Sequence, residues 1–522
     1  MIALTIDGKT VQVPEGTTVL DAAEKLGVRI PTLCHLPGHP DPPTSCFVCV
    51  VRIQGHRTLV PSCAMKVQEG MVVTADSEEV RAARVAALEL LLSEHRGDCV
   101  APCELACPAG LDVAALCEHL ARGENAEAIA VARRTIPFNS VLGRICPRFC
   151  ERACRRGLLD EPVTIAALQA LTGDLALEVT PQAQSSTGRH LAVVGAGPAG
   201  LSAAFYLLAA GHDCTILDAG NEAGGRLRAI SEECLPRLVL DREIDVIRRM
   251  GARFRMNAPL LDRESLDELC VEFDAVLLTL GASRGSGDAR SVDLELLRKL
   301  GLGVSTKGLA VDADGATAMA KVFAAGESVY GTGYAVRAVA AGRAAAEAID
   351  RFLTSAARPT KLINVRMGKL SDEELKVVRC DADPAARVTS EPLSSAEAVG
   401  QARRCLSCSC SARQDCDLRR LASVHGANPN RYRGASRTFK RVLSHSAVVL
   451  EPGKCILCGR CVRITADAAE AFGLTFVGRG FSTTPEVPLG RTLAQGLTTS
   501  AESVVQACPT GALALRRKLN GT

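Results

Sequence analysis

Residues 190–200 read HLAVVGAGPAG, an apolar run that passes directly into the pattern G-x-G-x-x-G. That order predicts a strand, a tight turn and a helix, because glycine lets the chain turn sharply and lets a pyrophosphate approach the helix N-terminus. A second apolar run follows at residues 214–217 and ends at an acid that suits a ribose hydroxyl. The stretch therefore predicts a dinucleotide site made by Gly195, Gly197, Pro198, Ala199, Gly200 and Asp218.

The surrounding residues, 189–355, alternate strand-like and helical segments, as expected of a parallel α/β sheet in a Rossmann-like domain. Residues 191–211 carry no formal charge and are long enough to span a bilayer. Three glycines and a proline in their first half favour a strand, a turn and a helix instead. We therefore expect no membrane insertion.

The amino-acid composition limits which partners the protein is expected to bind and in which cellular compartment we expect it. The chain has 522 residues, with 61 Lys and Arg against 58 Asp and Glu, no Trp and 3% aromatic residues. This near balance and the few aromatic residues argue against a nucleic-acid partner. The 23 cysteines are too many for chance, and the chain is too long for a small disulfide scaffold. The N-terminus lacks the pattern of a signal peptide, so we expect a cytoplasmic protein whose clustered cysteines bind metal.

Residues 1–75 predict a small β-rich domain with four of these cysteines in the pattern C-x11-C-x2-C-x13-C. Four thiolates with one close pair can hold a two-iron cluster, and zinc is the alternative. The long first spacing favours iron. The expected ligands are Cys34, Cys46, Cys49 and Cys63.

Residues 76–185 predict a helical domain with six further cysteines. Two four-iron clusters need eight ligands, so this set is incomplete by itself. The six are Cys99, Cys103, Cys107, Cys146, Cys150 and Cys154.

Two more cysteine groups lie in the C-terminal part. Residues 356–440 are polar, irregular and basic, and resemble a connector; they contain Cys405, Cys408, Cys410 and Cys416, whose spacing suits either a four-iron cluster or structural zinc. Residues 441–522 contain a C-x2-C-x2-C run with a remote Cys-Pro, the bacterial-ferredoxin arrangement for one four-iron cluster. Its expected ligands are Cys455, Cys458, Cys461 and Cys508.

Five cysteines stand alone in or near apolar segments, and we interpret them as small buried hydrophobic residues. They are Cys117, Cys214, Cys234, Cys270 and Cys380.

The two ends of the chain resemble the large iron–sulfur subunit of complex I. At the N-terminal end the likeness rests on Cys34, on SCFVCVV at residues 45–51 and on PSCA at residues 61–64. Residues 441–522 are similar to another region of that subunit. The resemblance implies a β-grasp two-iron ferredoxin domain at one end and a ferredoxin-like four-iron domain at the other.

The middle resembles the glutamate synthase small subunit and dihydropyrimidine dehydrogenase, through CVAPC at 99–103, CPAG at 107–110, GRICP at 143–147 and CERACRR at 150–156. In that family a glutamine from a later helix binds one cluster, and Gln169 occupies the matching position. The family has a cysteine before Cys99 where this chain has none, and His95 is the nearest candidate. The resemblance thus implies one cluster on His95, Cys99, Cys103 and Cys154, and another on Cys107, Cys146, Cys150 and Gln169.

The resemblance to this family also implies that the dinucleotide is FAD and not NAD. GGRL at residues 224–227 and VFAAGE at residues 322–327 resemble its second FAD-contacting region, which adds Gly225, Arg226, Gly326 and Glu327 to the expected site. The family usually has Asp in place of Glu327. Its members carry a nicotinamide-binding domain between the two FAD segments, yet here the strand-like residues 277–280 and 322–324 are about 40 residues apart, too few for such a domain.

Together, the resemblances imply an oxidoreductase that serves as the electron-transfer subunit of a soluble, multisubunit NAD(P)-linked complex, such as a hydrogenase, a formate dehydrogenase or a bifurcating reductase. The implied cofactors are FAD, one [2Fe-2S] cluster and three to four [4Fe-4S] clusters, with zinc as the alternative at the Cys405 group. The implied partners are an NADH- and FMN-binding subunit like that of complex I and a catalytic oxidoreductase subunit. The alternative is an NAD(P)H-oxidising flavoprotein of the glutamate synthase type.

Overall fold

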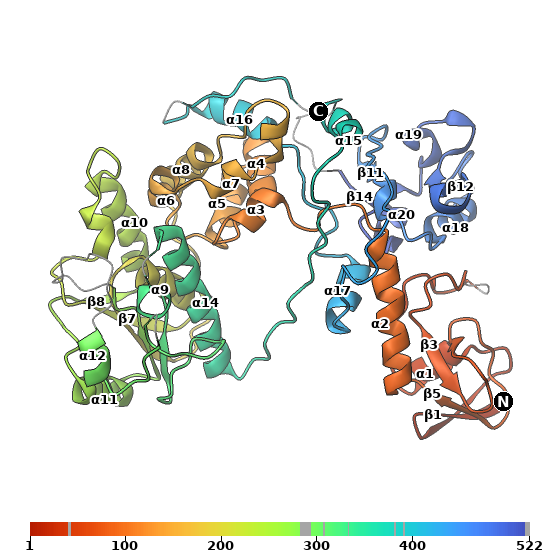
Figure 1. Cartoon of the computed structure of the whole chain (residues 1–522), viewed down its shortest axis with the longest axis horizontal. Helices are drawn as coiled ribbons and strands as arrows, with labels where there is room; N and C mark the ends of the chain where they lie inside the picture. The colour runs from red at the N-terminus through yellow and green to blue at the C-terminus, as the bar shows by residue number, and fades with distance from the viewer. Residues whose placement is uncertain are drawn as a thin grey trace. The chain divides into compact units, whose positions relative to one another are not determined.

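The computed structural model describes residues 1–39, 43–281, 294–305, 308–331, 333–380, 383–389 and 392–516 (Figure 1). These residues form two compact units. Unit 1 comprises Met1–Ala101, Pro359–Asp381 and Ser407–Arg517, and unit 2 comprises Pro102–Arg358 and Ala382–Leu406. Each unit is therefore built from segments that are distant in the sequence.

Unit 1 begins with a five-stranded sheet of order β2-β1-β5-β3-β4. Its core contains Leu4, Ile6, Val51 and Val73, and two of its cluster cysteines, Cys49 and Cys63, belong to the same core. Helix α1 starts with a capping box in which the Thr18 side chain and the N3 residue Asp21 bond reciprocally. The elements are β1 (Ile2–Ile6), β2 (Lys9–Val13), α1 (Val19–Lys25), β3 (Val50–Ile53), β4 (Val60–Pro61) and β5 (Met71–Thr74).

The rest of unit 1 is a helix followed, much later in the chain, by a small α/β region. Strands β11 and β14 pair antiparallel, with Val449 opposite Ala514, and β12 pairs with β13. The elements are α2 (Glu78–Ser93), α15 (Asp372–Cys380), α17 (Asp417–Val424), β11 (Val448–Leu450), α18 (Arg460–Asp467), β12 (Thr475–Val477), β13 (Thr484–Glu486), α19 (Leu493–Gly496), α20 (Ala501–Ala507) and β14 (Leu513–Leu515).

Unit 2 contains a helical part in which α6 and α8 pack so closely that their backbones are in contact. A Cβ atom on Gly173 would lie 1.9 Å from the Ser140 nitrogen, and one on Gly143 would lie 2.5 Å from the Ala170 nitrogen. Only glycine permits so close an approach. The elements are α3 (Pro102–Ala106), α4 (Val113–Ala121), α5 (Asn125–Arg133), α6 (Asn139–Ile145), α7 (Phe149–Arg152), α8 (Ile165–Ala176) and α16 (Ser395–Arg403).

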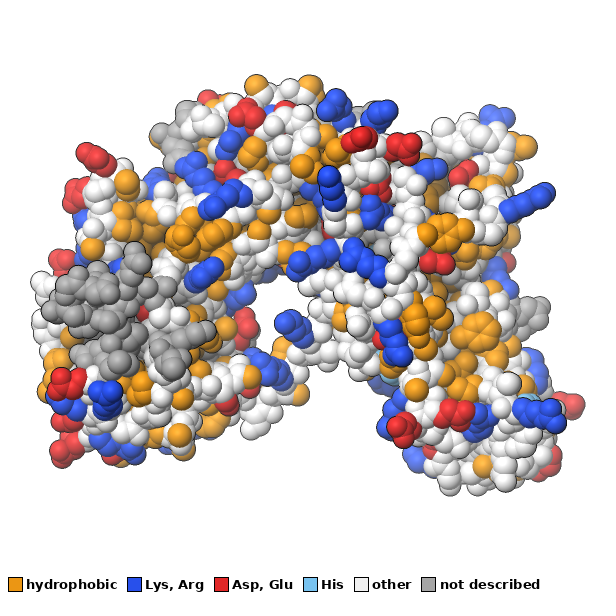
Figure 2. Space-filling view, in the orientation of Figure 1, with side chains coloured by type: hydrophobic (Ala, Val, Ile, Leu, Met, Phe, Trp, Pro, Cys, Tyr) orange, Lys and Arg blue, Asp and Glu red, His pale blue; other side chains and the backbone are white. Residues whose placement is uncertain are grey.

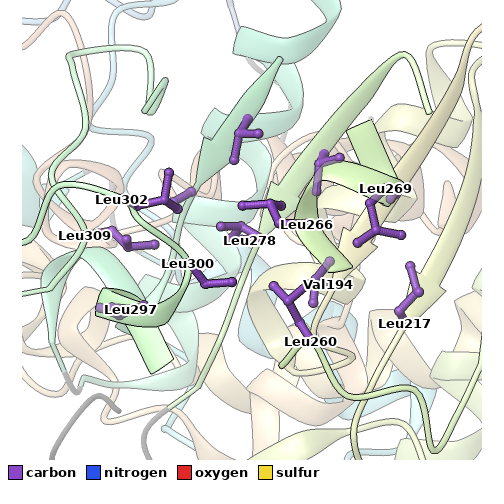
Figure 3. Packing of buried hydrophobic residues seen from close by; sticks show 14 of the residues in the cluster. Val194, Leu217, Leu260, Leu266, Leu269, Leu278, Leu297, Leu300, Leu302 and Leu309 are labelled. Atoms are coloured by element: carbon purple, nitrogen blue, oxygen red, sulfur yellow. The ribbon is translucent and has the colours of Figure 1, made fainter. Parts of the chain in front are cut away.

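The other part of unit 2 is an all-parallel sheet of order β10-β9-β6-β7-β8. Figure 3 shows its core, where Val194, Leu217 and Leu278 of the strands face Leu266 and Leu269 of α11. The elements are β6 (His190–Val194), α9 (Pro198–Ala209), β7 (Asp213–Leu217), α10 (Arg237–Arg249), β8 (Arg253–Arg255), α11 (Arg263–Glu272), β9 (Ala275–Leu278), α12 (Leu294–Lys299), β10 (Val322–Ala324), α13 (Glu327–Tyr330) and α14 (Ala335–Thr354). The expected multidomain α/β fold, with a Rossmann-like region, is confirmed.

The stretch at residues 356–440, expected to be an irregular connector, is largely irregular but also contains three short helices. They are α15, α16 and α17. Local capping explains two of them: Ser394 and Glu397 form a capping box on α16, and the Cys416 side chain accepts the Arg419 N–H at the start of α17. Polar composition obscured these helices because short helices with strong caps need few apolar residues.

No helix within the described ranges is both long and apolar enough to cross a membrane. Basic and acidic side chains both occur on the surface of each unit (Figure 2), as the small net charge of +3 predicts.

Candidate functional site

The glycine loop after β6 has the geometry that a dinucleotide pyrophosphate needs. Gly195 has φ +110°, and a Cβ atom on Gly200 would lie 1.9 Å from the Gly195 carbonyl oxygen. A Cβ atom on Gly197 would meet no protein atom within 4 Å, so the loop leaves open space where α9 begins. The free N–H groups of α9 face anions favourably there, and these residues therefore fit FAD.

Two side chains hold this loop in place through hydrogen bonds. The Asp218 carboxylate, directly after β7, accepts the Ala196 N–H at 2.7 Å and the Gly220 N–H at 2.7 Å. The Thr279 hydroxyl, directly after β9, donates to the carbonyls of Val194 and Gly195 at 3.0 Å. Asp218 thus shapes the loop and still has lone pairs for a ribose hydroxyl. Sequence reasoning missed Thr279, although it follows a predicted strand directly.

The second expected flavin region lies against the first. The Gly224 N–H donates to the Ala196 carbonyl at 2.8 Å, and a Cβ atom on Gly225 would lie 3.0 Å from the Gly197 Cα. The Arg226 guanidinium pairs with the Glu327 carboxylate at 2.9 Å. Gly326 has φ +78°, and its Cβ position is 2.9 Å from the Ala199 Cβ. The structure therefore brings all ten expected flavin residues to one edge of the sheet.

The first cysteine set comes together in the N-terminal domain. Cys34, Cys46, Cys49 and Cys63 are at most 3% exposed, and the Cys49 and Cys63 sulfurs lie 3.4 Å apart. Phe47, between the close pair, adopts φ +52°, which makes the loop tight. A hydrogen bond from the Cys63 thiol lowers the pKa of Cys49 to about 7. Four converging sulfurs fit a two-iron cluster.

The last cysteine set lines one cavity. Cys455, Cys458, Cys461 and Cys508 surround it together with apolar side chains such as Leu513. The Leu457 N–H lies 3.3 Å from the Cys455 sulfur, and the Leu513 N–H lies 3.5 Å from the Cys508 sulfur. Burial raises the pKa of Cys455 to about 11 and that of Cys458 to about 12. Backbone N–H groups aimed at sulfur fit a four-iron cluster, whose potential such bonds tune.

In unit 2, α3, which directly precedes Cys107, packs against α7, which carries Cys150. Burial raises the pKa of Cys150, and the charges of Cys107, Glu151 and Cys146 raise it further. Gln169 lies on α8 and is 5% exposed. Within the described part of the chain, its amide nitrogen has no hydrogen-bond partner. A buried, unpaired amide on a helix that packs against α6, which ends at Cys146, is consistent with a ligand role.

The other expected ligands fall into different groups than expected. Cys405, just after α16, contacts Cys117 on α4, and these two helices pack against each other. Cys103 and Cys154 belong to the same unit 2. His95 and Cys99 instead line a cavity with Cys410 and Cys416, all in unit 1. Cys405 and Cys410, five residues apart, thus lie in different units. The sequence had instead placed Cys405 and Cys410 in the same metal centre.

The solitary cysteines also differ from expectation. Cys214 is 1% exposed, as predicted, whereas Cys234 is exposed in the turn before α10, where no core element covers it. Cys117 is buried, but it contacts Cys405 and not only apolar residues. Cys270 is partly buried, and the Cys380 side chain lies outside the described residues. Among the described side chains, no three or more His, Cys, Asp or Glu are arranged to hold a single metal ion.

Four family models match successive stretches of the chain. They are a 2Fe-2S iron–sulfur cluster binding domain at residues 1–78, dihydropyrimidine dehydrogenase domain II with a 4Fe-4S cluster at 93–180, pyridine nucleotide-disulphide oxidoreductase at 162–344, and the ferredoxin-like domain of NADH-quinone oxidoreductase subunit 3 at 446–514. The predicted mosaic of iron–sulfur and flavoprotein domains, and the kinds of cofactor that it implies, are confirmed.

Curated relatives match parts of the chain. The beta subunit of an NADP(+)-dependent formate dehydrogenase from Moorella thermoacetica is 33% identical over 212 residues, 36% of this chain and 30% of the relative. The HndD subunit of an NADP-reducing hydrogenase from Solidesulfovibrio fructosivorans is 51% identical over 104 residues, 19% of this chain and 18% of the relative. The small chain of a glutamate synthase [NADPH] from Mycobacterium tuberculosis is 37% identical over 192 residues, 36% of this chain and 39% of the relative. The first curated relatives are matched over 28% of their own length.

Proposed function

We propose that this chain is the electron-transfer subunit of a cytoplasmic, multisubunit NAD(P)-linked oxidoreductase, of the hydrogenase, formate dehydrogenase or bifurcating reductase type. One observation carries the proposal: a flavin-type glycine loop and several sets of buried cysteines occur in a single chain. When bound, FAD exchanges electrons in pairs and iron–sulfur clusters exchange them singly. Relatives named as subunits of formate dehydrogenase and hydrogenase support this assignment.

The chain's own residues would hold the cofactors and keep water from them. Gly195, Gly197 and the start of α9 would receive the FAD pyrophosphate, and Asp218 a ribose hydroxyl. Arg226 and Glu327 pair with each other and directly follow Gly225 and Gly326, the two glycines that approach the loop. At the C-terminal set, the Arg437 guanidinium donates to the Cys455 carbonyl at 3.0 Å and places a positive charge near an anionic cluster.

We propose that the nicotinamide cofactor reacts on a partner subunit. Strands β9 and β10 are direct neighbours in the sheet, with Val276 opposite Val322. The chain between them, residues 279–321, is shorter than an inserted domain, which takes at least about 50 residues. The expected partners are an NADH- and FMN-binding subunit like that of complex I and a catalytic oxidoreductase subunit.

The test is anaerobic purification with iron, sulfide, zinc and flavin quantified. We expect FAD, with iron for one two-iron and up to four four-iron clusters, and no NAD(P)H oxidation until the NADH-binding partner is added. A colourless, zinc-containing protein would overturn the proposal.

The alternative is a glutamate synthase-type flavoprotein that oxidises NAD(P)H itself. The identity of 37% with a glutamate synthase small chain favours it. Rapid reduction of a dye by NADPH, catalysed by the isolated chain, would support this alternative over the first function.

A further inference from the structure

A cavity in unit 1 collects side chains from three distant segments. His95 and Cys99 follow α2, Val365 precedes α15, and Cys410 and Cys416 precede α17. The remaining wall is mostly apolar, with two arginines: Leu92, Ile363, Arg413, Leu418 and Arg419. All of these residues belong to unit 1, so the cavity lies inside one compact body.

Backbone hydrogen bonds fix the three segments to one another. The Cys410 N–H donates to the Asp98 carbonyl at 3.0 Å, and the Cys99 N–H donates to the Val365 carbonyl at 3.1 Å. The Asp98 carboxylate also accepts the Met367 N–H at 2.8 Å. Cys99 and Cys410 are therefore held close to each other by the main chain, independently of any ligand.

The sulfurs have the surroundings of cluster ligands. Cys99, Cys410 and Cys416 are between 5% and 9% exposed. The Arg419 N–H points at the Cys416 sulfur at 3.4 Å, the kind of bond that stabilises a thiolate bound to iron. A Cβ atom on Gly511 would lie 2.2 Å from the Cys410 sulfur, so a glycine is needed where this sulfur sits.

His95 lines the same cavity. Its ring nitrogen Nδ1 is buried, and the described residues provide it with no hydrogen-bond partner. Buried polar atoms in folded proteins nearly always have a partner, so the unpaired nitrogen is consistent with a bound ligand. A histidine and three cysteines then surround the same cavity.

We propose that His95, Cys99, Cys410 and Cys416 bind one four-iron cluster, and that Cys405, which lies in unit 2 with Cys103 and Cys154, belongs instead to a second centre in that unit. The segment from Cys405 to Cys416 therefore does not hold a cluster alone. It contributes to two centres, one in each unit. This assignment rests on the proposed function only in treating these cysteines as cluster ligands.

The first experiment compares single variants of the full chain, purified anaerobically and examined by iron analysis and electron paramagnetic resonance. Cys99→Ala, Cys410→Ala and Cys416→Ala should each lose about four irons and the same signal. Cys405→Ala should keep that signal and lose the one that Cys103→Ala and Cys154→Ala also lose. The control is Cys234→Ala, whose side chain is exposed.

The second experiment tests the histidine by pulsed paramagnetic resonance. The wild type should show coupling from an imidazole nitrogen on the signal lost in Cys410→Ala. His95→Cys should retain the irons and lose this coupling, while His56→Cys, at an exposed position, should change neither. Because His95→Cys preserves four ligands, it remains informative if other variants fail to fold.

Three results would overturn the assignment. If Cys405→Ala and Cys410→Ala lost the same paramagnetic signal, the segment from Cys405 to Cys416 would hold a single centre. Nitrogen coupling that persists in His95→Cys would exclude the histidine. If the wild type contained one zinc per chain and Cys410→Ala lost it, the site would hold a zinc ion and not a cluster. Absence of iron from the wild type would instead contradict the proposed function, so the two failures are distinguishable.

Discussion

At the scale of single residues, the glycine loop shows two different reasons for glycine. Gly200 is required by the protein itself, because its Cβ position is 1.9 Å from the Gly195 carbonyl oxygen. Gly197 has φ −82° and no protein atom within 4 Å of its Cβ position. The space beside Gly197 is thus free for a ligand, and the chain alone would tolerate a side chain there.

This difference predicts opposite effects of two similar substitutions. Gly197→Ala should leave the FAD-free protein as stable as the wild type, or about 0.5 kcal/mol more stable, but weaken FAD binding at least about tenfold. Gly200→Ala should destabilise the protein by about 1–3 kcal/mol through steric overlap and also lose FAD. Thermal unfolding and flavin fluorescence measure the two effects. Normal FAD content in Gly197→Ala would contradict the assigned pyrophosphate position.

At the scale of elements, one ion pair attaches α15 to the segment that carries His95. The Arg96 guanidinium binds the Glu374 carboxylate through two bonds of 2.8 and 2.6 Å, and the N–H groups of Ser371 and Phe439 donate to the same carboxylate. Burial by itself raises the pKa of Glu374, but these donors outweigh it and lower the pKa to about 2. The pair therefore stabilises the ionised form.

We expect Glu374→Gln to destabilise unit 1 by about 2–3 kcal/mol at pH 7. Because the folded-state pKa lies below the unfolded one, the stabilising effect is complete above about pH 4.5 and is lost as the pH falls towards 2. Chemical denaturation of both proteins between pH 7 and pH 3 should show the difference shrinking. Glu373→Gln, at the exposed neighbouring position, is the matched control. A difference that does not depend on pH would contradict this explanation.

At the scale of the whole molecule, the flavin loop and the C-terminal cysteine set belong to different compact units. Each has its own core: Val194 and Leu278 lie in one, and Leu450 and Leu513 in the other. Loss of one cofactor should therefore not remove the other.

Cys458→Ala should reduce the iron content by about four per chain and leave the FAD content unchanged. Gly197→Ala should do the reverse, with full iron and little FAD. Iron analysis and the flavin absorbance of the same preparations measure both. Loss of FAD in Cys458→Ala would show that the two units depend on each other for cofactor binding.

Centres whose parts are close together in the chain can be predicted from the sequence alone. The loop at residues 190–200 and the run from Cys455 to Cys461 can be recognised because one turn of backbone places several of their groups around one ligand. The helices α15, α16 and α17 escaped recognition because each is short, at most nine residues, and lies in a stretch that is otherwise irregular.

The grouping of cysteines that are distant in the sequence depends on how the chain packs. The spacing of Cys405, Cys408, Cys410 and Cys416 suggested one centre, yet Cys405 packs with Cys117 and Cys410 lies in the cavity with His95 and Cys99. The physical reason is that main-chain bonds such as Cys410 to Asp98 join segments about 300 residues apart. Such pairings depend on how elements pack, which local spacing does not encode.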